Sequence, residues 1–199
     1  MSHPKIILAS RSPARRALMK ELGIPFECHT SDYPEDMTLK KSSPDLAIHL
    51  ALGKAEYIAP KFPNSIIIGA DTFIVAHGQK IGKPESIEDA KRIIGLMSDS
   101  TILVISGIAT VQTDKDGVII KGLVGHVNTH LKIMKLSEKD IKSMAEHKDA
   151  LQISGAFSIE GHGGQFVEKI EGDYNNVIGL PTIQLKEMLQ KLGVNFTNE

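Results

Sequence analysis

The sequence contains little cysteine, with Cys28 as the single example among 199 residues. One thiol excludes an internal disulfide and provides no cluster of metal ligands, so we interpret Cys28 as a small buried side chain. The first ten residues, MSHPKIILAS, contain an apolar run too short for a signal peptide. No stretch approaches the roughly 20 apolar residues that span a membrane. We therefore expect a reducing, cytoplasmic environment and no membrane partner.

An excess of charge of either sign is also lacking, because 23 Lys and Arg face 24 Asp and Glu, for a net charge of −1. The basic residues are scattered, which excludes the basic stripe that a nucleic acid polymer usually requires but leaves room for a small anionic ligand. Neither a GxGxxG nor a Walker A motif occurs, which disfavours the two commonest nucleotide-binding folds. Low-complexity segments are absent too, so we expect one globular domain over residues 1–199.

Turn and capping signals divide the chain into mixed elements. Apolar β-branched runs predict strands at residues 6–9, on both sides of the Asp71-Thr72 step, at 101–113 and at 117–134. Serine or proline followed by helical spacing predicts helices that begin near Ser12, Ser43, Ser86, Ser137 and Pro181. This order lacks the regular alternation of a doubly wound parallel sheet, so we expect a mixed α/β fold.

The stretch LASRSPARRALMKELG places Arg15 and Arg16 in the first turn of a predicted helix. A cation at this electropositive end costs on the order of 0.3–1 kcal/mol unless something negative is bound. The helix-start amides, the hydroxyls of Ser10 and Ser12, and Arg15 together match the donors that a phosphate needs. The alternative is an ordinary N-cap with solvated arginines. Arg16 is expected to be dispensable in either case.

Asp71 lies within an apolar strand, between IIIGA and TFIV. A carboxylate there costs several kcal/mol unless it is paired or binds a metal, which points to a general base or metal ligand. The alternative is a structural hydrogen-bond acceptor. Lys54 and Lys83 flank this strand in sequence and are candidates to converge on the same anion. Glu160 lies in a loop with clustered glycines, which permit a close approach of backbone to ligand.

Four segments follow one another along the chain: ILASRSPARRALMKELGIPFE, LALGKAE, IIIGADTFIVAHGQKIGKPES and GAFSIEGHGGQFVEKIEGDYNNVIGLP. Together they resemble the Maf family of nucleoside triphosphate pyrophosphatases over nearly the whole chain. The resemblance implies an α/β fold with an elongated mixed sheet, flanking helices and two lobes around a cleft, related to inosine triphosphate pyrophosphatases. It also implies hydrolysis of a nucleoside triphosphate to the monophosphate and pyrophosphate with Mg²⁺ or Mn²⁺, often in a homodimer.

The resemblance also implies roles for individual residues. Ser10 and Ser12 match the family's triphosphate cradle. The matching catalytic set is Arg15, Lys54, Asp71 and Lys83. In this set Asp71 orients or deprotonates the attacking water, and the cations neutralise the charge that grows on pyrophosphate. A divalent metal is expected on Asp71 and a second acid.

The sequence departs from the family pattern at several positions. The second acid falls in SDYPEDM, where Glu35 is the candidate and Asp32 or Asp36 are alternatives. Ile102 replaces an expected histidine, and Ile153 replaces a lysine before the SGAF segment. The departures at Ile102 and in the SGAF segment motivate an alternative of a different class, a nucleotide-binding regulator of septum formation in which binding rather than turnover matters.

Three positions in the sequence relate to which nucleotide base the family members recognise. Family members that act on dTTP and UTP share three residues: an arginine after the proline, a threonine after the catalytic aspartate, and a glutamine in the last loop. The branch that acts on 7-methyl-GTP has a non-arginine and a Glu at the outer two positions. This sequence has Ala14, Thr72 and Glu160. Because a carboxylate accepts hydrogen bonds from guanine and favours a cationic methylated base, we expect 7-methyl-GTP, with dTTP/UTP as the alternative.

Overall fold

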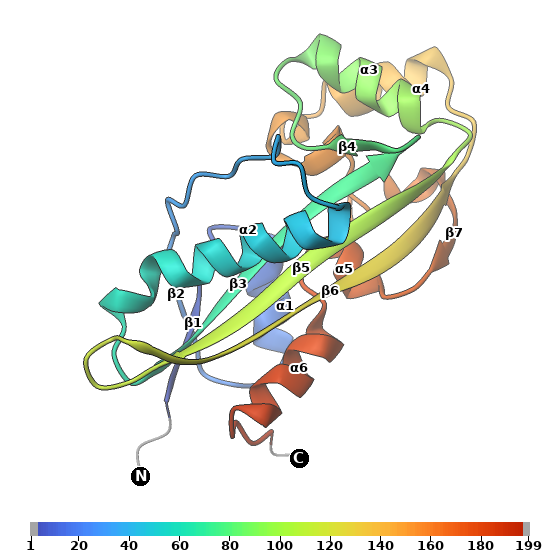
Figure 1. Ribbon diagram of the computed structural model, residues 1–199. Helices are drawn as coiled ribbons and strands as arrows, with labels where there is room; N and C mark the ends of the chain where they lie inside the picture. Colours follow the sequence, from blue (N-terminus) through green and yellow to red (C-terminus); the bar gives the residue numbers. More distant parts are fainter. Residues whose placement is uncertain (1–3, 197–199) are drawn as a thin grey trace. The chain divides into compact units, whose positions relative to one another are not determined.

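The computed structural model describes residues 4–196 as an α/β protein built on one mixed β-sheet with flanking helices (Figure 1). The described strands are β1 (Lys5–Leu8), β2 (Glu27–Cys28), β3 (Ser65–Ala76), β4 (Gln79–Ile81), β5 (Thr101–Thr113), β6 (Ile119–Ile133) and β7 (Val167–Glu171). Their order is β2-β1-β3-β5-β6-β7, with β4 paired to β3. Strand β1 runs parallel to β2 and β3, whereas the β3–β4 and β6–β7 pairs are antiparallel. This arrangement confirms the expected α/β fold with a mixed sheet.

The described α-helices are α1 (Pro13–Glu21), α2 (Ser43–Ile58), α3 (Ile87–Met97), α4 (Glu138–Ala145), α5 (Tyr174–Ile178) and α6 (Thr182–Lys191). Four of them, α1 to α4, begin at or one residue from the serine caps that the sequence predicts, and α6 begins after the predicted Pro181. Single 3₁₀ turns occur at Ala59–Lys61, Ala150–Gln152, Ser154–Ala156 and Gly164–Phe166. In α2 the cap is Ser42, one residue before the expected start, and its hydroxyl accepts from the Asp45 N–H. Serine caps satisfy helix-start amides that otherwise lack partners.

The chain forms two compact units. Unit 1 comprises the residues up to Asp71, Ser106–Val127 and the residues from Gly179 onward, and unit 2 comprises Thr72–Ile105 and Asn128–Ile178. Strands β3, β5 and β6 contribute residues to both units. Two units agree with the two lobes that the family resemblance implies. The cleft between them and the single domain over residues 1–199 stay predictions.

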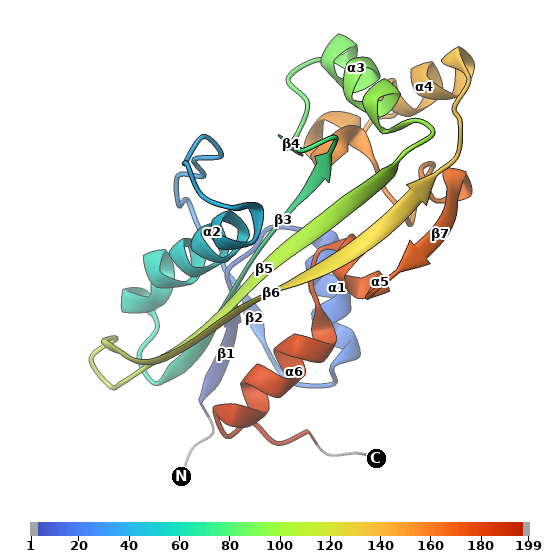
Figure 2. The same cartoon turned by 45° about the vertical axis from the view of Figure 1, so that its right-hand side comes forward.

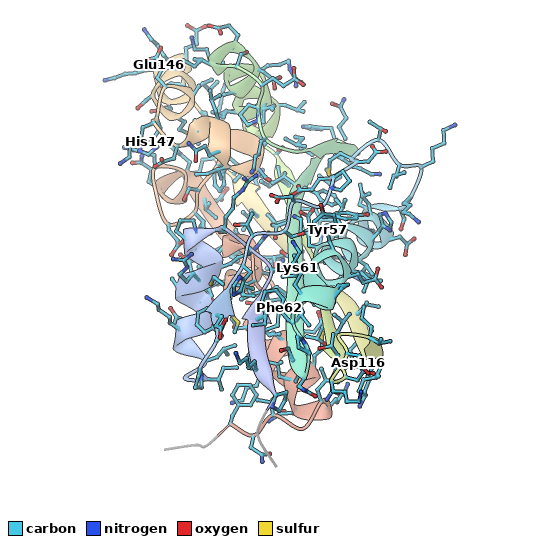
Figure 3. The ribbon with its side chains drawn as sticks, turned by 90° about the vertical axis from the view of Figure 1, so that its left-hand side faces the viewer. Tyr57, Lys61, Phe62, Asp116, Glu146 and His147 are labelled. Atoms are coloured by element: carbon cyan, nitrogen blue, oxygen red, sulfur yellow. The ribbon has the colours of Figure 1, made fainter. Side chains whose placement is uncertain are left out.

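In unit 1 the backbone of α2 lies directly on the sheet. A Cβ at Gly69 of β3 would lie 2.0 Å from the Ala51 carbonyl oxygen, and one at Gly107 of β5 would lie 2.0 Å from that of Ala47. Helix α1 covers the opposite face of the sheet (Figures 2 and 3). The absence of a side chain at Gly69 and Gly107 therefore allows the backbone of α2 to approach the strands closely. The side chains on the inner face of α2 approach the strands with it.

The Gly107→Ala substitution is expected to lower the free energy of unfolding by about 2–3 kcal/mol, because the added methyl meets helix backbone that cannot rotate away. Chemical denaturation measures the loss. Gly82→Ala is the matched control, since a Cβ at Gly82 has nothing within 4 Å and should change stability by less than about 0.5 kcal/mol. Equal stability of the two variants would contradict the close approach of α2 to β5.

Unit 2 is built around a hairpin and two helices. The dipeptide His77-Gly78 predicts a turn, and strand β3 turns into β4 there, with φ of 47° and 75°. Helices α3 and α4 pack over an apolar cluster that includes Ile94 and Phe157. Among the described residues, no helix is both long and apolar enough to cross a lipid bilayer.

Candidate active site

The turn between β1 and α1 is held by two serine hydroxyls. The backbone N–H of Ser12 donates to Ser10 Oγ at 3.1 Å, and the N–H of Arg15 donates to Ser12 Oγ at 3.3 Å. The second bond confirms Ser12 as the N-cap of α1. A hydroxyl that accepts a backbone N–H can still donate its own hydrogen, so this geometry leaves both serines chemically suited to bind an oxyanion.

The Arg15 side chain is half-buried and held in place by the backbone. Its Nε donates to the carbonyl oxygen of Gly179 at 2.8 Å. Burial lowers the pKa of the Arg15 guanidinium, whereas the charges of Asp71 and Glu35 act to raise it. The chain's own carboxylates therefore supply part of the negative charge that a first-turn arginine needs. The neighbouring Arg16 is exposed.

Lys54 lies between two carboxylates. Its Nζ is 2.5 Å from Asp71 Oδ1 and 3.0 Å from Glu35 Oε1. Lys54 and Asp71 are only 7% and 5% exposed, so each depends on the other for charge compensation. Glu35, in contrast, is exposed and connects the pair to the surface.

The local sequence explains why Lys54 and Asp71 meet. Residues two apart on a strand share a face, so Asp71 lies on the same face of β3 as Gly69. That face is covered by α2, whose backbone touches Gly69 at Ala51. Lys54 follows Ala51 by three residues, which places it on the same side of the helix. The glycine contact thus brings the ammonium group down onto the carboxylate.

Of the three acids in SDYPEDM, the structure places Glu35 against Lys54. Asp36 instead accepts hydrogen bonds from the hydroxyl and the backbone N–H of Thr38, at 2.6 and 2.8 Å. These bonds lower the pKa of the Asp36 carboxyl. Asp32 is exposed. The geometry favours Glu35 among the alternatives that the sequence left open.

The other sequence candidates belong to unit 2, apart from Ala14, which is half-buried in the first turn of α1. Thr72 is half-buried, and its carbonyl accepts a hydrogen bond from Ser154 Oγ at 3.1 Å. Lys83 follows β4, and Glu160 lies in a turn of the glycine-rich segment, both exposed. Their roles stay predictions.

Ile102, which departs from the family pattern, is part of the hydrophobic core. Ile102 is fully buried in the apolar cluster of unit 2, where it packs as a core residue. An isoleucine at this position therefore contributes to packing rather than to a polar network.

Glu35 and Asp71 are suited to hold a divalent cation together with substrate. Mg²⁺ is usually bound through one or two protein carboxylates, with substrate phosphates and water completing the shell. Within residues 4–196, no group of three or more His, Cys, Asp or Glu side chains gathers into a metal cage. This donor set fits a metal that arrives with a phosphate, and it does not fit a closed structural site.

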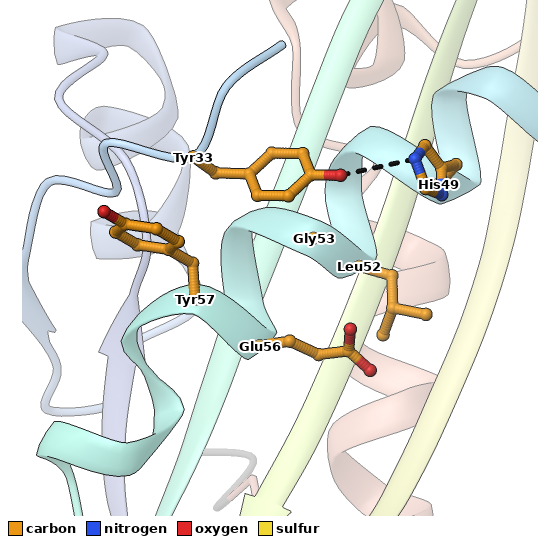
Figure 4. A pocket seen from close by; sticks show the side chains of 6 residues that line it. All are labelled: Tyr33, His49, Leu52, Gly53, Glu56 and Tyr57. Carbon is orange, nitrogen blue, oxygen red and sulfur yellow. Dashed lines mark hydrogen bonds between the residues drawn. The ribbon is translucent and has the colours of Figure 1, made fainter. Parts of the chain in front are cut away.

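Two features of unit 1 were not predicted from the sequence. The Gly179 carbonyl that binds Arg15 has no signature in a sequence, since every residue has a carbonyl. The ring of Tyr33 lies over α2 beside His49 and Tyr57, where these side chains border a hollow of about 290 Å³ (Figure 4).

Comparisons with known proteins agree with the motifs. The family model described as "Maf-like protein" matches residues 5–192. A dTTP/UTP pyrophosphatase of Dictyoglomus thermophilum is 38% identical, over 95% of this chain and 96% of that protein. One of Methanosarcina barkeri is 36% identical over 98% of both chains. Among solved structures, a HAM1 protein from Coxiella burnetii covers 94% of this chain and 99% of its own, with 16% identity and a TM-score of 0.46.

Proposed function

The chain belongs to the Maf family, and on this premise we propose that it hydrolyses a nucleoside triphosphate to the nucleoside monophosphate and pyrophosphate. The observation that carries the proposal is the cluster of two cations and two carboxylates in unit 1, which comprises Arg15, Glu35, Lys54 and Asp71. Cations suit the charged triphosphate, and a buried acid suits the activation of water.

The reaction divides into tasks that these side chains can perform. Water attacks the α-phosphorus, the bond from that phosphorus to the bridging oxygen breaks, and pyrophosphate leaves. Asp71, which is paired with Lys54, accepts the proton of the attacking water. Arg15 and Lys54 neutralise the charge that grows on the leaving pyrophosphate. A divalent metal held by Glu35 and Asp71 would supply further charge neutralisation when bound.

A triphosphate also changes the partners of Lys54. Without ligand, its ammonium group has Asp71 and Glu35 as partners. Phosphate oxygens compete for the same three N–H donors, so binding of substrate redistributes Lys54 between phosphate and carboxylate. In this proposal, the contacts of Lys54 with Asp71 and Glu35 therefore describe the ligand-free enzyme.

We propose dTTP and UTP as the substrates. Two observations support this choice: relatives of 38% and 36% identity are named dTTP/UTP pyrophosphatases, and Thr72 follows Asp71 as in the family members with that specificity. The choice differs from the expectation of 7-methyl-GTP, which rests on Ala14 and Glu160 alone. That second candidate stays open because a carboxylate at 160 favours a cationic methylated base.

The test is pyrophosphate release by the purified chain with Mg²⁺ or Mn²⁺ and a panel of canonical and modified triphosphates. We expect dTTP and UTP to have the highest kcat/KM. Faster hydrolysis of 7-methyl-GTP would select the second candidate, and no release from any triphosphate would refute the proposed activity.

The paired substitution Ala14→Arg with Glu160→Gln is expected to raise kcat/KM for dTTP relative to 7-methyl-GTP by roughly tenfold or more, because a hydrogen bond to a charged group is worth about 1.5–3 kcal/mol. Competition between the two nucleotides measures the ratio. Glu168→Gln, which removes another exposed carboxylate of unit 2, is the control. An unchanged ratio would exclude both positions from base recognition.

A further inference from the structure

The ring of Tyr33 is docked onto the outer surface of α2. Its hydroxyl shares a hydrogen bond of 3.3 Å with His49 Nε2, and its ring meets that of Tyr57 edge-to-face, with centroids 6.4 Å apart (Figure 4). Tyr33 comes from the segment between β2 and α2, residues 29–42, which contains no described helix or strand. The contacts of Tyr33 with His49 and Tyr57 join this segment to the helix.

Gly53 makes room for the ring. A Cβ at this position would lie 2.3 Å from Tyr33 Cζ and 2.6–2.7 Å from the two Cε atoms, so an alanine here would displace the ring. Glycine in a helix interior is less stable than alanine, because it loses more backbone entropy on folding. Helix α2 therefore contains an unfavourable residue at the position where Tyr33 docks.

This contact lies next to the cluster described above. Tyr33 precedes Glu35 by two residues, and Gly53 immediately precedes Lys54. Glu35 and Lys54 are themselves joined at 3.0 Å. The ring on the glycine and the ion pair are thus two adjacent contacts between the same loop and the same helix.

We propose that Tyr33 is a positioning residue, which holds the Glu35 carboxylate against Lys54 by docking on Gly53 and His49. The inference rests on the proposed function, because it gives Glu35 its part in pyrophosphate release. It adds to that function an aromatic anchor that touches neither the substrate nor the reacting atoms.

The decisive variant is Gly53→Ala, because it should separate activity from stability. We expect kcat for pyrophosphate release to fall about tenfold, while the thermal midpoint stays equal or rises. Hydrogen–deuterium exchange of residues 29–42 should become faster at the same time. Gly95→Ala in α3 is the matched control: its Cβ would meet nothing closer than 4.0 Å, so it should keep full activity.

Double variants test whether Tyr33 acts through Glu35. Tyr33→Ala should lower kcat about as much as Gly53→Ala, and combining the two should add little, because there is no ring left to displace. In a Glu35→Gln background, Tyr33→Ala should lose most of its effect. Tyr33→Phe keeps the ring on Gly53 and should restore part of the activity.

The outcomes separate this inference from the proposed function. An active wild-type chain whose Gly53→Ala variant keeps full kcat would overturn the positioning role alone, as would additive effects of Tyr33→Ala and Glu35→Gln. A wild-type chain that releases no pyrophosphate would overturn the proposed function, and the positioning role with it. In that case the exchange measurement would still report whether the ring anchors the loop.

Discussion

Replacing Asp71 by asparagine is expected to lower kcat for pyrophosphate release about 10³-fold, within the range of roughly 10²–10⁴ for loss of a general base. The amide keeps the size of the carboxylate and can still accept a hydrogen bond from Lys54, but it cannot take a proton from water. The ammonium group also keeps Glu35 as a charged partner. The variant should therefore fold and bind nucleotide.

Three measurements check this expectation. Pyrophosphate release at saturating dTTP or UTP gives kcat, calorimetric titration gives the nucleotide affinity, and thermal unfolding verifies the fold. Asp116→Asn is the matched control, because this exposed acid lies at the tip of the β5–β6 hairpin in the same unit. It should leave all three values unchanged.

The possible results have different meanings. Full turnover in Asp71→Asn would reduce Asp71 to a structural partner of Lys54, the alternative that burial alone suggests. Loss of turnover with retained nucleotide binding, together with an unchanged effect on septum formation in cells, would favour the regulator. Two departures from the family pattern motivate this regulatory alternative: the buried apolar Ile102, where a histidine is expected, and the SGAF segment.

Much of the fold is predictable from the sequence because local signals are strong there. An aspartate three residues later predicts the caps Ser86 of α3 and Ser137 of α4, whereas the proline that follows Ser12 predicts the cap of α1. The dipeptide His77-Gly78 predicts the turn after β3. The sequence does not predict four of the described strands and helices: β2, β4, β7 and α5. A strand of two residues such as β2 is defined by its neighbour β1, and no local pattern reveals it.

The sequence predicts individual residues of the candidate site, but it does not predict which of their side chains contact each other. Asp71 stands out because a carboxylate within an apolar strand is costly, and the structure pairs it with Lys54. The sequence predicts instead that Lys54 meets an external anion, since spacing along a chain cannot show two side chains converging across a helix–sheet contact. Glu35 could not be separated from its neighbouring acids because the segment has no periodicity that assigns a direction to each side chain.

Replacing Lys54 by methionine is expected to cost about 3–5 kcal/mol of the free energy of unfolding at neutral pH, because it removes the cation that contacts the buried Asp71. Glu35, no longer bridged to Asp71 by the ammonium group, adds a second negative charge nearby. Chemical denaturation measures the loss. Lys61→Met, at an exposed lysine shortly after α2, is the control and should change stability by less than about 0.5 kcal/mol.

The double variant Lys54→Met with Asp71→Asn decides whether the cost comes from charge. If an uncompensated carboxylate causes it, neutralising Asp71 should recover most of the lost stability, although the amide still needs a hydrogen-bond partner. If the cost comes instead from the fit of the lysine stem beneath α2, the double variant should be no more stable than Lys54→Met. Recovery of stability without recovery of turnover would assign Lys54 two separable tasks: it compensates Asp71 in the ligand-free fold, and it binds phosphate during the reaction.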